Sequence, residues 1–180
     1  MQSSMYKQIL LYLILIITLA ILQLSFISNL PWQLSQLNLF LVILIFILSL
    51  GSFKTALWMT IGIGILFDIF SFNLFGFFLI CLFLTILFAN FLLINFFTNH
   101  SLYSFCALTF FSTLFYKFIL NLVINIFNFF NNQITFFVFF QQFYQNLIAQ
   151  LILNLFFAIL LFYIIYYSTN KLKPIFLHKK

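Results

Sequence analysis

Long apolar runs, separated only by short polar segments, make up almost the whole chain. Of its 180 residues, 66% are hydrophobic and 4% are charged. A water-soluble domain carries about a quarter charged residues, so a soluble globular protein is excluded. A helix needs about 20 apolar residues to cross the hydrocarbon layer of a membrane. We therefore predict an all-α, polytopic integral membrane protein with about six transmembrane helices in one bundle.

Polar breaks divide the chain into six expected spans within a single transmembrane domain over 1–180. Pro31 and Trp32 mark the first break, because proline disfavours helix continuation and tryptophan favours the membrane interface. The start of the last span stays open, because Gln141, Gln142 and Gln145 interrupt its apolar run. The expected spans are 9–27, 37–52, 55–70, 76–97, 102–127 and 141–167, followed by a short basic tail over 168–180.

The lysines predict the orientation of the spans. Positive residues gather in cytoplasmic loops close to the ends of spans. With both termini in the cytoplasm, every lysine except Lys117 lies on the inner side, in the N-terminal segment, at Lys54 or in the C-terminal tail. The net charge of +6 does not indicate a nucleic-acid partner, because a chain this apolar has no surface on which a basic patch could read a groove.

Residues that commonly carry chemistry are few and scattered. Cys81 and Cys106 lie inside apolar runs and are expected to pack as small buried residues, without a disulfide or a metal. His100 and His178 lie alone in polar segments, and no serine has a histidine and an acid in a nucleophile pattern. We therefore expect no enzyme activity, no cofactor and no metal site.

One face of the third expected span combines small residues with the single acidic residue of the chain. Ala56, Thr60, Gly64 and Asp68 follow at intervals of four, which places them on one side of a helix. Small residues let another helix approach closely, so this face is expected to point into the bundle. Asp68 then faces protein, water or a cation, or it caps the outer end of its span at the water interface.

Lys117 is expected at a depth similar to that of Asp68. It lies roughly 23 Å from the inner end of the fifth span, and Asp68 lies roughly 20 Å from the inner end of the third, at about 1.5 Å per residue. An intramembrane ion pair between the two would cost far less than an isolated lysine. The alternative is that the Lys117 side chain extends to the outer headgroups.

Two polar stripes follow the helical repeat. Steps of four, with one step of three in the first stripe, relate the members of each stripe. Such residues either join helices, line a cavity for a small molecule or occur by chance. On the fifth span the stripe comprises Thr113, Lys117, Asn121, Asn125 and Asn128, and on the last span it comprises Gln142, Asn146, Gln150 and Asn154.

A motif in the third and fourth spans resembles one in the bacterial rod-shape-determining MreD family. The third span contains Gly62 and Gly64 and ends in an apolar-apolar-Asp segment at Asp68, with Ser71 three positions on and Gly76 eight positions on. The resemblance covers the stretch from Pro31 to about Asn90, roughly a third of the chain. It implies that these motif residues shape the interior or a surface for a partner.

The MreD resemblance also implies a function, a location and a set of partners. Such a protein would be a scaffold in the bacterial inner membrane, within the cell-elongation machinery that maintains rod shape. It would bind lipid and a single-span MreC-like protein, and link MreB-type filaments to the peptidoglycan synthases. By analogy, its fold would be similar to that of the substrate-binding subunits of energy-coupling-factor transporters. The alternative function is therefore a substrate-binding membrane subunit of a vitamin-type transporter.

Overall fold

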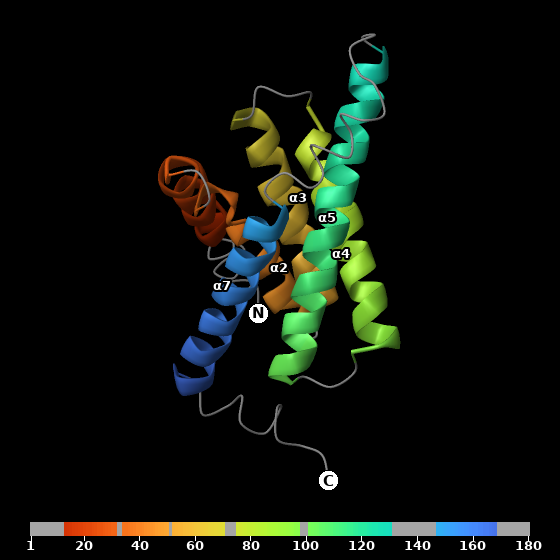
Figure 1. Ribbon diagram of the computed structural model, residues 1–180. Coiled ribbons are helices and arrows are strands. Elements are labelled where there is room, and N and C mark those ends of the chain that lie inside the picture. The colour runs from red at the N-terminus through yellow and green to blue at the C-terminus, as the bar shows by residue number, and fades with distance from the viewer. Residues whose placement is uncertain are drawn as a thin grey trace, which may run out of the picture.

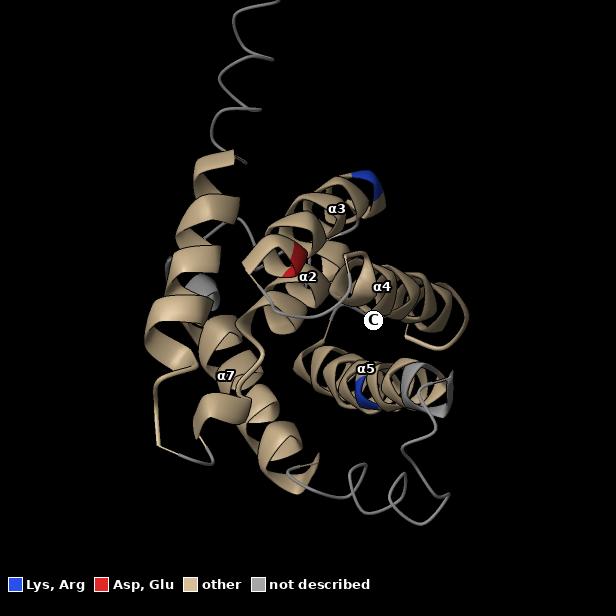
Figure 2. Ribbon diagram, turned by 90° about the horizontal axis from the view of Figure 1, so that it is seen from above, with Lys and Arg blue, Asp and Glu red and all other residues tan. Residues whose placement is uncertain are grey.

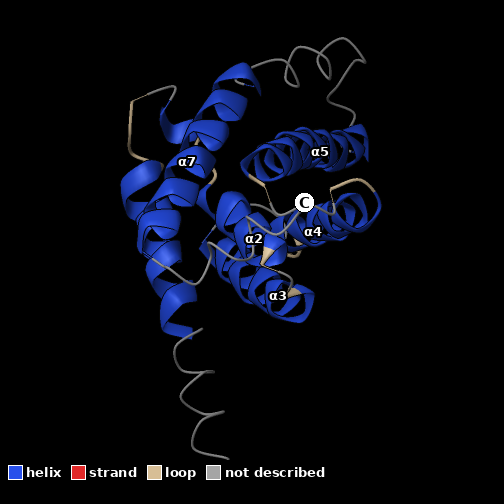
Figure 3. Ribbon diagram, turned by 90° about the horizontal axis from the view of Figure 1, so that it is seen from below, coloured by secondary structure: helices blue, strands red, loops and turns tan. Residues whose placement is uncertain are grey.

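Helices form all the regular structure in the described part of the chain (Figure 3). The computed structural model describes residues 13–31, 34–50, 52–70, 75–97, 101–130 and 147–168. A chain in lipid has to satisfy its backbone hydrogen bonds internally, which favours helices for runs of this composition. The prediction of an all-α protein is confirmed for these residues.

The helices follow the expected spans in order along the chain. An apolar helix over Leu13–Ile27 comes first. Its last part, η1 (Leu22–Ile27), is wound as a π-helix, and a short 3-10 helix, η2 (Leu34–Gln36), follows. The remaining helices are α2 (Leu39–Ser49), α3 (Phe53–Phe70), α4 (Phe77–Asn95), α5 (Leu102–Phe130) and α7 (Leu147–Ser168).

Four helices are long and apolar enough to cross a membrane: α3, α4, α5 and α7. In contrast, α2 has 11 residues. At about 1.5 Å per residue it is about 16 Å long, roughly half the thickness of the hydrocarbon layer. The structure thus supports a membrane-embedded helical protein. The total of six spans, the expected span over 37–52 and the cytoplasmic termini stay predictions.

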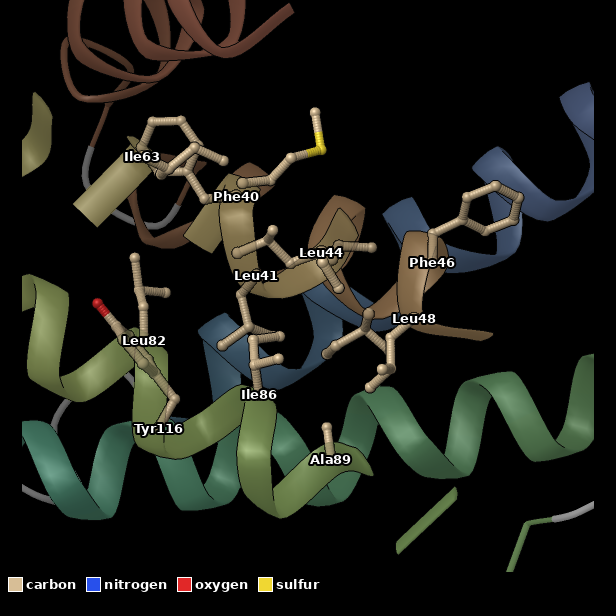
Figure 4. Close-up of a cluster of buried hydrophobic side chains, with 14 of the residues drawn as sticks. Phe40, Leu41, Leu44, Phe46, Leu48, Ile63, Leu82, Ile86, Ala89 and Tyr116 are labelled. Carbon is tan, nitrogen blue, oxygen red and sulfur yellow. The ribbon is translucent and has the colours of Figure 1, made fainter. Parts of the chain in front are cut away.

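The short helix α2 lies in the middle of the bundle. Its sequence is apolar on every side, which is typical of a helix surrounded by protein. Leu41, Val42, Leu44 and Ile45 are all 0% exposed. The helix contacts α3, α4, α5 and α7, and Figure 4 shows side chains from α2, α4 and α5 meeting in one cluster.

The longer helices surround α2. In sequence order, α3 packs on α4, α4 on α5, and α5 on α7 (Figure 1). Large apolar side chains such as Trp58, Phe91 and Ile148 are exposed on the outer faces, as expected where lipid replaces water. The charged residues of the described helices lie on α3 and α5 (Figure 2).

Several sequence predictions concern residues outside the described ranges. They include the first residues of the expected first span, the start of the expected last span at 141 and nearly all of the basic tail. Of the candidate site residues, Ser71, Gln142 and Asn146 lie outside as well, and Asn128 is helical with a side chain outside the description. These expectations stay predictions.

Candidate functional site

Asp68 is buried near the end of α3 and caps the start of α4. Its side chain is 3% exposed. One carboxylate oxygen, Oδ1, accepts a hydrogen bond from the Phe78 N–H at 2.8 Å. The other, Oδ2, accepts from the N–H groups of Gly76 at 3.0 Å and Leu79 at 3.2 Å. The carboxylate thus points at protein and holds the backbone of the neighbouring helix.

The start of α4 needs this carboxylate because it lacks a cap of its own. The first N–H groups of a helix have no partner within the helix. The residue at the N-cap position is Gly76, which has no side chain to accept them and has a φ of 94°, a conformation that favours glycine. A negative charge is also favourable near the positive end of the helix dipole. The Asp68 side chain on α3 therefore provides the hydrogen-bond acceptors that Gly76 lacks.

Gly64 allows α4 to approach α3 one turn before Asp68. A Cβ atom on Gly64 would lie 2.8 Å from the Cα atom of Leu79, closer than real Cβ atoms come to a backbone atom. Leu79 is also one of the residues whose N–H group binds Asp68. Gly64, Asp68 and Gly76 thus act on the same short stretch of chain, and we call these three residues the α3–α4 joint.

Gly62 contacts a different part of the bundle. A Cβ atom on Gly62 would lie 3.0 Å from the Cδ1 atom of Ile16, at the flexible end of a side chain of the first helix. The motif therefore divides in the structure: Gly64, Asp68 and Gly76 belong to the α3–α4 joint, and Gly62 packs on the first helix.

The predicted ion pair between Asp68 and Lys117 stays a prediction. Lys117 is half-buried on α5 and lines a cavity that Phe67 and Phe78 also line. Phe67 precedes Asp68 in the sequence, and the N–H group of Phe78 binds the Asp68 carboxylate. The two charged residues therefore border the same region of the bundle. Three hydrogen bonds to the Asp68 carboxylate come from the backbone at the start of α4.

The predicted polar stripe on α5 faces inward over much of its length. Thr113 is 2% exposed and donates to the carbonyl of Phe110 at 2.8 Å. Asn121 is also buried, and its backbone carbonyl accepts from the side chain of Asn125 at 2.7 Å. The stripe thus includes residues in the interior of the bundle. Whether they join helices, line a cavity or occur there by chance stays open, as in the sequence analysis.

The stripe on α7 contributes two buried amides, Gln150 and Asn154. The Oδ1 atom of Asn154 accepts from the backbone N–H of Asn38 at 2.9 Å, across 116 positions of sequence. Asn38 in turn caps α2, because its side chain accepts from the N–H of Leu41 at 3.1 Å. The polar residue of α7 therefore fixes the segment from which the central helix begins.

Gln23 is an important residue that sequence analysis missed. Its Nε2 group donates to the carbonyl of Leu37 at 2.9 Å, and its Oε1 atom accepts from the N–H of Leu39 at 3.0 Å. It thereby ties the first helix to the start of α2. The signal was an amide within an otherwise apolar run, and Asn38, also missed, stands directly before an apolar run as an N-cap residue does.

Several of these residues surround a partly open cavity of about 220 Å³. It lies at the end of the bundle where α3 ends and α2 and α4 begin. Its polar lining comes from four parts of the chain: the first helix, the segment before α2, α5 and α7. It comprises Gln23, Ser35, Gln36, Asn38, Tyr116, Lys117 and Gln150. A mixed polar and apolar cavity of this kind can hold a small molecule by a few directed contacts.

The two cysteines lie near the start of α4 (Cys81) and near the start of α5 (Cys106). Both are free thiols, with Cys81 buried and Cys106 half-buried. Within the described residues there is no group of three or more His, Cys, Asp or Glu side chains that could hold a metal ion.

Replacing Gln23 by methionine is expected to lower the free energy of unfolding by about 1–3 kcal/mol. Methionine keeps the length of the side chain but leaves the Leu37 carbonyl and the Leu39 N–H without their partner. The measurement is reversible unfolding in mixed micelles, followed by helical circular dichroism. Gln36→Met is the control, because Gln36 lines the same cavity and a change within about 0.5 kcal/mol is expected there. Equal losses in both variants would contradict the assigned role of Gln23.

The polar end of the bundle thus holds two features of interest. One is the α3–α4 joint, which is made of motif residues, and the other is the cavity beside it. No family model, curated protein or solved structure matches the chain.

Proposed function

We propose that this protein is a non-catalytic membrane scaffold of the bacterial cell-elongation machinery. In this role it links an MreC-like single-span protein and the MreB-type cytoskeleton to peptidoglycan synthesis, and so maintains rod shape. The proposal places the protein in the inner membrane with both termini in the cytoplasm. It rests on the motif resemblance and on what the motif residues do in the bundle.

The observation that carries the proposal is the α3–α4 joint. Gly64, Asp68 and Gly76 are the motif residues that fix one helix against the next. They do so through a close backbone approach and through three hydrogen bonds that backbone N–H groups donate to the Asp68 carboxylate. None of these contacts leaves a reactive group at a surface, since the carboxylate is buried and engaged. A rigid joint of this kind suits a protein whose task is to hold partners in a fixed arrangement.

An apolar surface next to the joint is a suitable place for a partner helix. We call Ile65, Ile69, Phe70 and Phe75 the joint surface. All four are exposed, and Ile69 and Phe70 are about 60% exposed. They project from the end of α3 and from the turn into α4, so the joint controls their relative positions. A single transmembrane helix offers the apolar, uncharged face that such a surface would bind in lipid.

The test is recovery of partners from membranes. A tag after Lys180 allows the protein to be purified in mild detergent, and mass spectrometry identifies what accompanies it. MreC-like or wall-synthase proteins are expected. The variant Ile69→Ala/Phe70→Ala should reduce their recovery about tenfold, which corresponds to about 1.4 kcal/mol. Ile148→Ala/Ile152→Ala is the matched control, since both residues are exposed apolar positions on α7.

Two outcomes would contradict the proposal. Recovery of an ATPase and a coupling subunit in place of wall-synthesis proteins would identify a transport subunit. Equal loss of partners in the α3 and α7 variants would show that the joint surface has no special role. Expression in both variants is checked on the same membranes, so that reduced protein levels are not mistaken for reduced binding.

A further inference from the structure

The cavity is lined by a side-chain amide, that of Gln150, whose oxygen accepts no hydrogen bond from the described part of the chain. Gln150 lines the cavity and is 7% exposed. Its Oε1 atom is buried and has no hydrogen bond within the described part of the chain. A buried acceptor without a partner costs about 1–3 kcal/mol. A hydrogen-bond donor placed in the cavity would remove this cost.

The same cavity presents a positive charge. Lys117 is half-buried on α5 and lines the cavity. Partial burial removes part of the water around its ammonium group. The carboxylate of Asp68 is engaged by three backbone N–H groups of α4. An anion in the cavity would compensate the loss of hydration around the ammonium group and would form a charge-assisted hydrogen bond.

The rest of the cavity wall combines aromatic rings with three leucines. Phe40, Phe67, Phe78 and the ring of Tyr116 line it together with Leu37, Leu82 and Leu120. The ring centroids of Phe40 and Phe67 are 5.3 Å apart and those of Phe67 and Phe78 are 4.6 Å apart, both edge to face. A planar ring packs well against such an arrangement, because aromatic pairs prefer edge-to-face or offset contacts. The wall therefore favours a flat, apolar ligand body over a compact hydrated ion.

The size of the cavity limits the ligand further. A water molecule occupies about 30 Å³ in the liquid, so 220 Å³ has room for about seven waters or for roughly ten covalently bonded heavy atoms. A phospholipid is much larger than this, although its phosphate group alone would fit.

We propose that this cavity binds a small aromatic carboxylate that carries a hydroxyl or amino group on its ring. The carboxylate bonds the ammonium group of Lys117, the ring packs on the phenylalanine wall, and the ring substituent donates to Oε1 of Gln150. This site is independent of the proposed scaffold function, since it shares no residue with the joint surface.

The test uses the full-length protein in lipid nanodiscs and three probes. These are 4-hydroxybenzoate, benzoate without the donor, and 4-hydroxybenzyl alcohol without the charge. We expect saturable binding of 4-hydroxybenzoate by equilibrium dialysis. Each of the other two probes should bind about five- to tenfold more weakly, since each lacks one directed contact. This comparison needs no variant and so does not depend on the folding of a mutant.

Variants assign the contacts to residues. Lys117→Met should weaken 4-hydroxybenzoate at least about tenfold and leave 4-hydroxybenzyl alcohol unchanged, whereas Lys117→Arg should retain binding. Gln150→Leu should weaken 4-hydroxybenzoate about fivefold and leave benzoate unchanged. Asn125→Leu is the matched control on α5, because Asn125 is half-buried and does not line the cavity.

Three results would overturn the inference. One is the absence of saturable binding for 4-hydroxybenzoate, 3-hydroxybenzoate and 4-aminobenzoate alike, which would mean a cavity filled by water only. Another is equal affinity for the three probes of the main comparison. The third is tightly bound anionic phospholipid that 4-hydroxybenzoate does not displace, because the anion site would then belong to a headgroup.

Discussion

Replacing Asp68 by alanine is expected to lower the free energy of unfolding by about 3 kcal/mol. The change removes the acceptor of three backbone hydrogen bonds from Gly76, Phe78 and Leu79. Each buried N–H group left without a partner costs about 1–3 kcal/mol. Part of this loss is offset, because the variant no longer buries a carboxylate. The loss should concentrate at the start of α4, where the uncapped turn is expected to unwind first.

The measurement is reversible unfolding in mixed micelles with helical circular dichroism as the signal. Asp68→Asn should lie between the wild type and Asp68→Ala, because an amide keeps one acceptor oxygen but loses the charge that favours the helix N-terminus. Lys54→Ala is the control for removal of a charge from α3, since Lys54 is exposed at the other end of the helix. A loss below about 1 kcal/mol for Asp68→Ala would contradict the capping role.

Hydrogen exchange adds a local test of the same idea. In Asp68→Ala the amide protons of Phe78 and Leu79 should exchange faster, while those in the second half of α4 change little. A uniform acceleration along α4 would indicate global destabilisation and not the loss of a cap.

The positions of the long helices could be predicted from apolar runs alone. The expected span over 55–70 corresponds to α3 at Phe53–Phe70, and the span over 76–97 corresponds to α4 at Phe77–Asn95. Runs of this length leave the backbone few alternatives to a helix in lipid. The burial of the short central helix α2 was harder to predict. It depends on how α3, α4, α5 and α7 surround α2, and the periodicity of the sequence carries no such information.

The partners of the polar residues could be predicted only in part. The spacing placed Asp68 on the same face as Gly64, but its bonds go to backbone N–H groups, which every residue except proline carries. The contact between Asn38 and Asn154 joins residues 116 positions apart. No local pattern specifies such a pairing. The cavity was missed as a defined site for the same reason, because its lining comes from elements distant in the sequence.

Replacing Gly64 by alanine is the second change with a large expected effect, a loss of about 2 kcal/mol. Alanine is a better helix former than glycine by about 1 kcal/mol. Replacing a glycine by alanine in an open part of α3 would therefore raise the free energy of unfolding. At Gly64 the added Cβ would lie 2.8 Å from the Cα of Leu79, and only a shift of the α4 backbone can relieve the contact. Overpacking of this kind costs about 1–3 kcal/mol, and the same shift would lengthen the bonds to Asp68.

Gly62→Ala is the matched control, two residues away in the same helix. Its added Cβ would meet the Cδ1 atom of Ile16 at 3.0 Å, and the end of that side chain can rotate away. The gain in helix propensity then compensates, so the free energy of unfolding should change by less than about 1 kcal/mol. If both variants behaved alike, the close approach at Leu79 would not be what holds α3 to α4. A loss of stability in Gly64→Ala but not in Gly62→Ala would support the role of this close approach. If the double variant Gly64→Ala/Asp68→Ala then loses less stability than the sum of the two single variants, both residues stabilise the same contact.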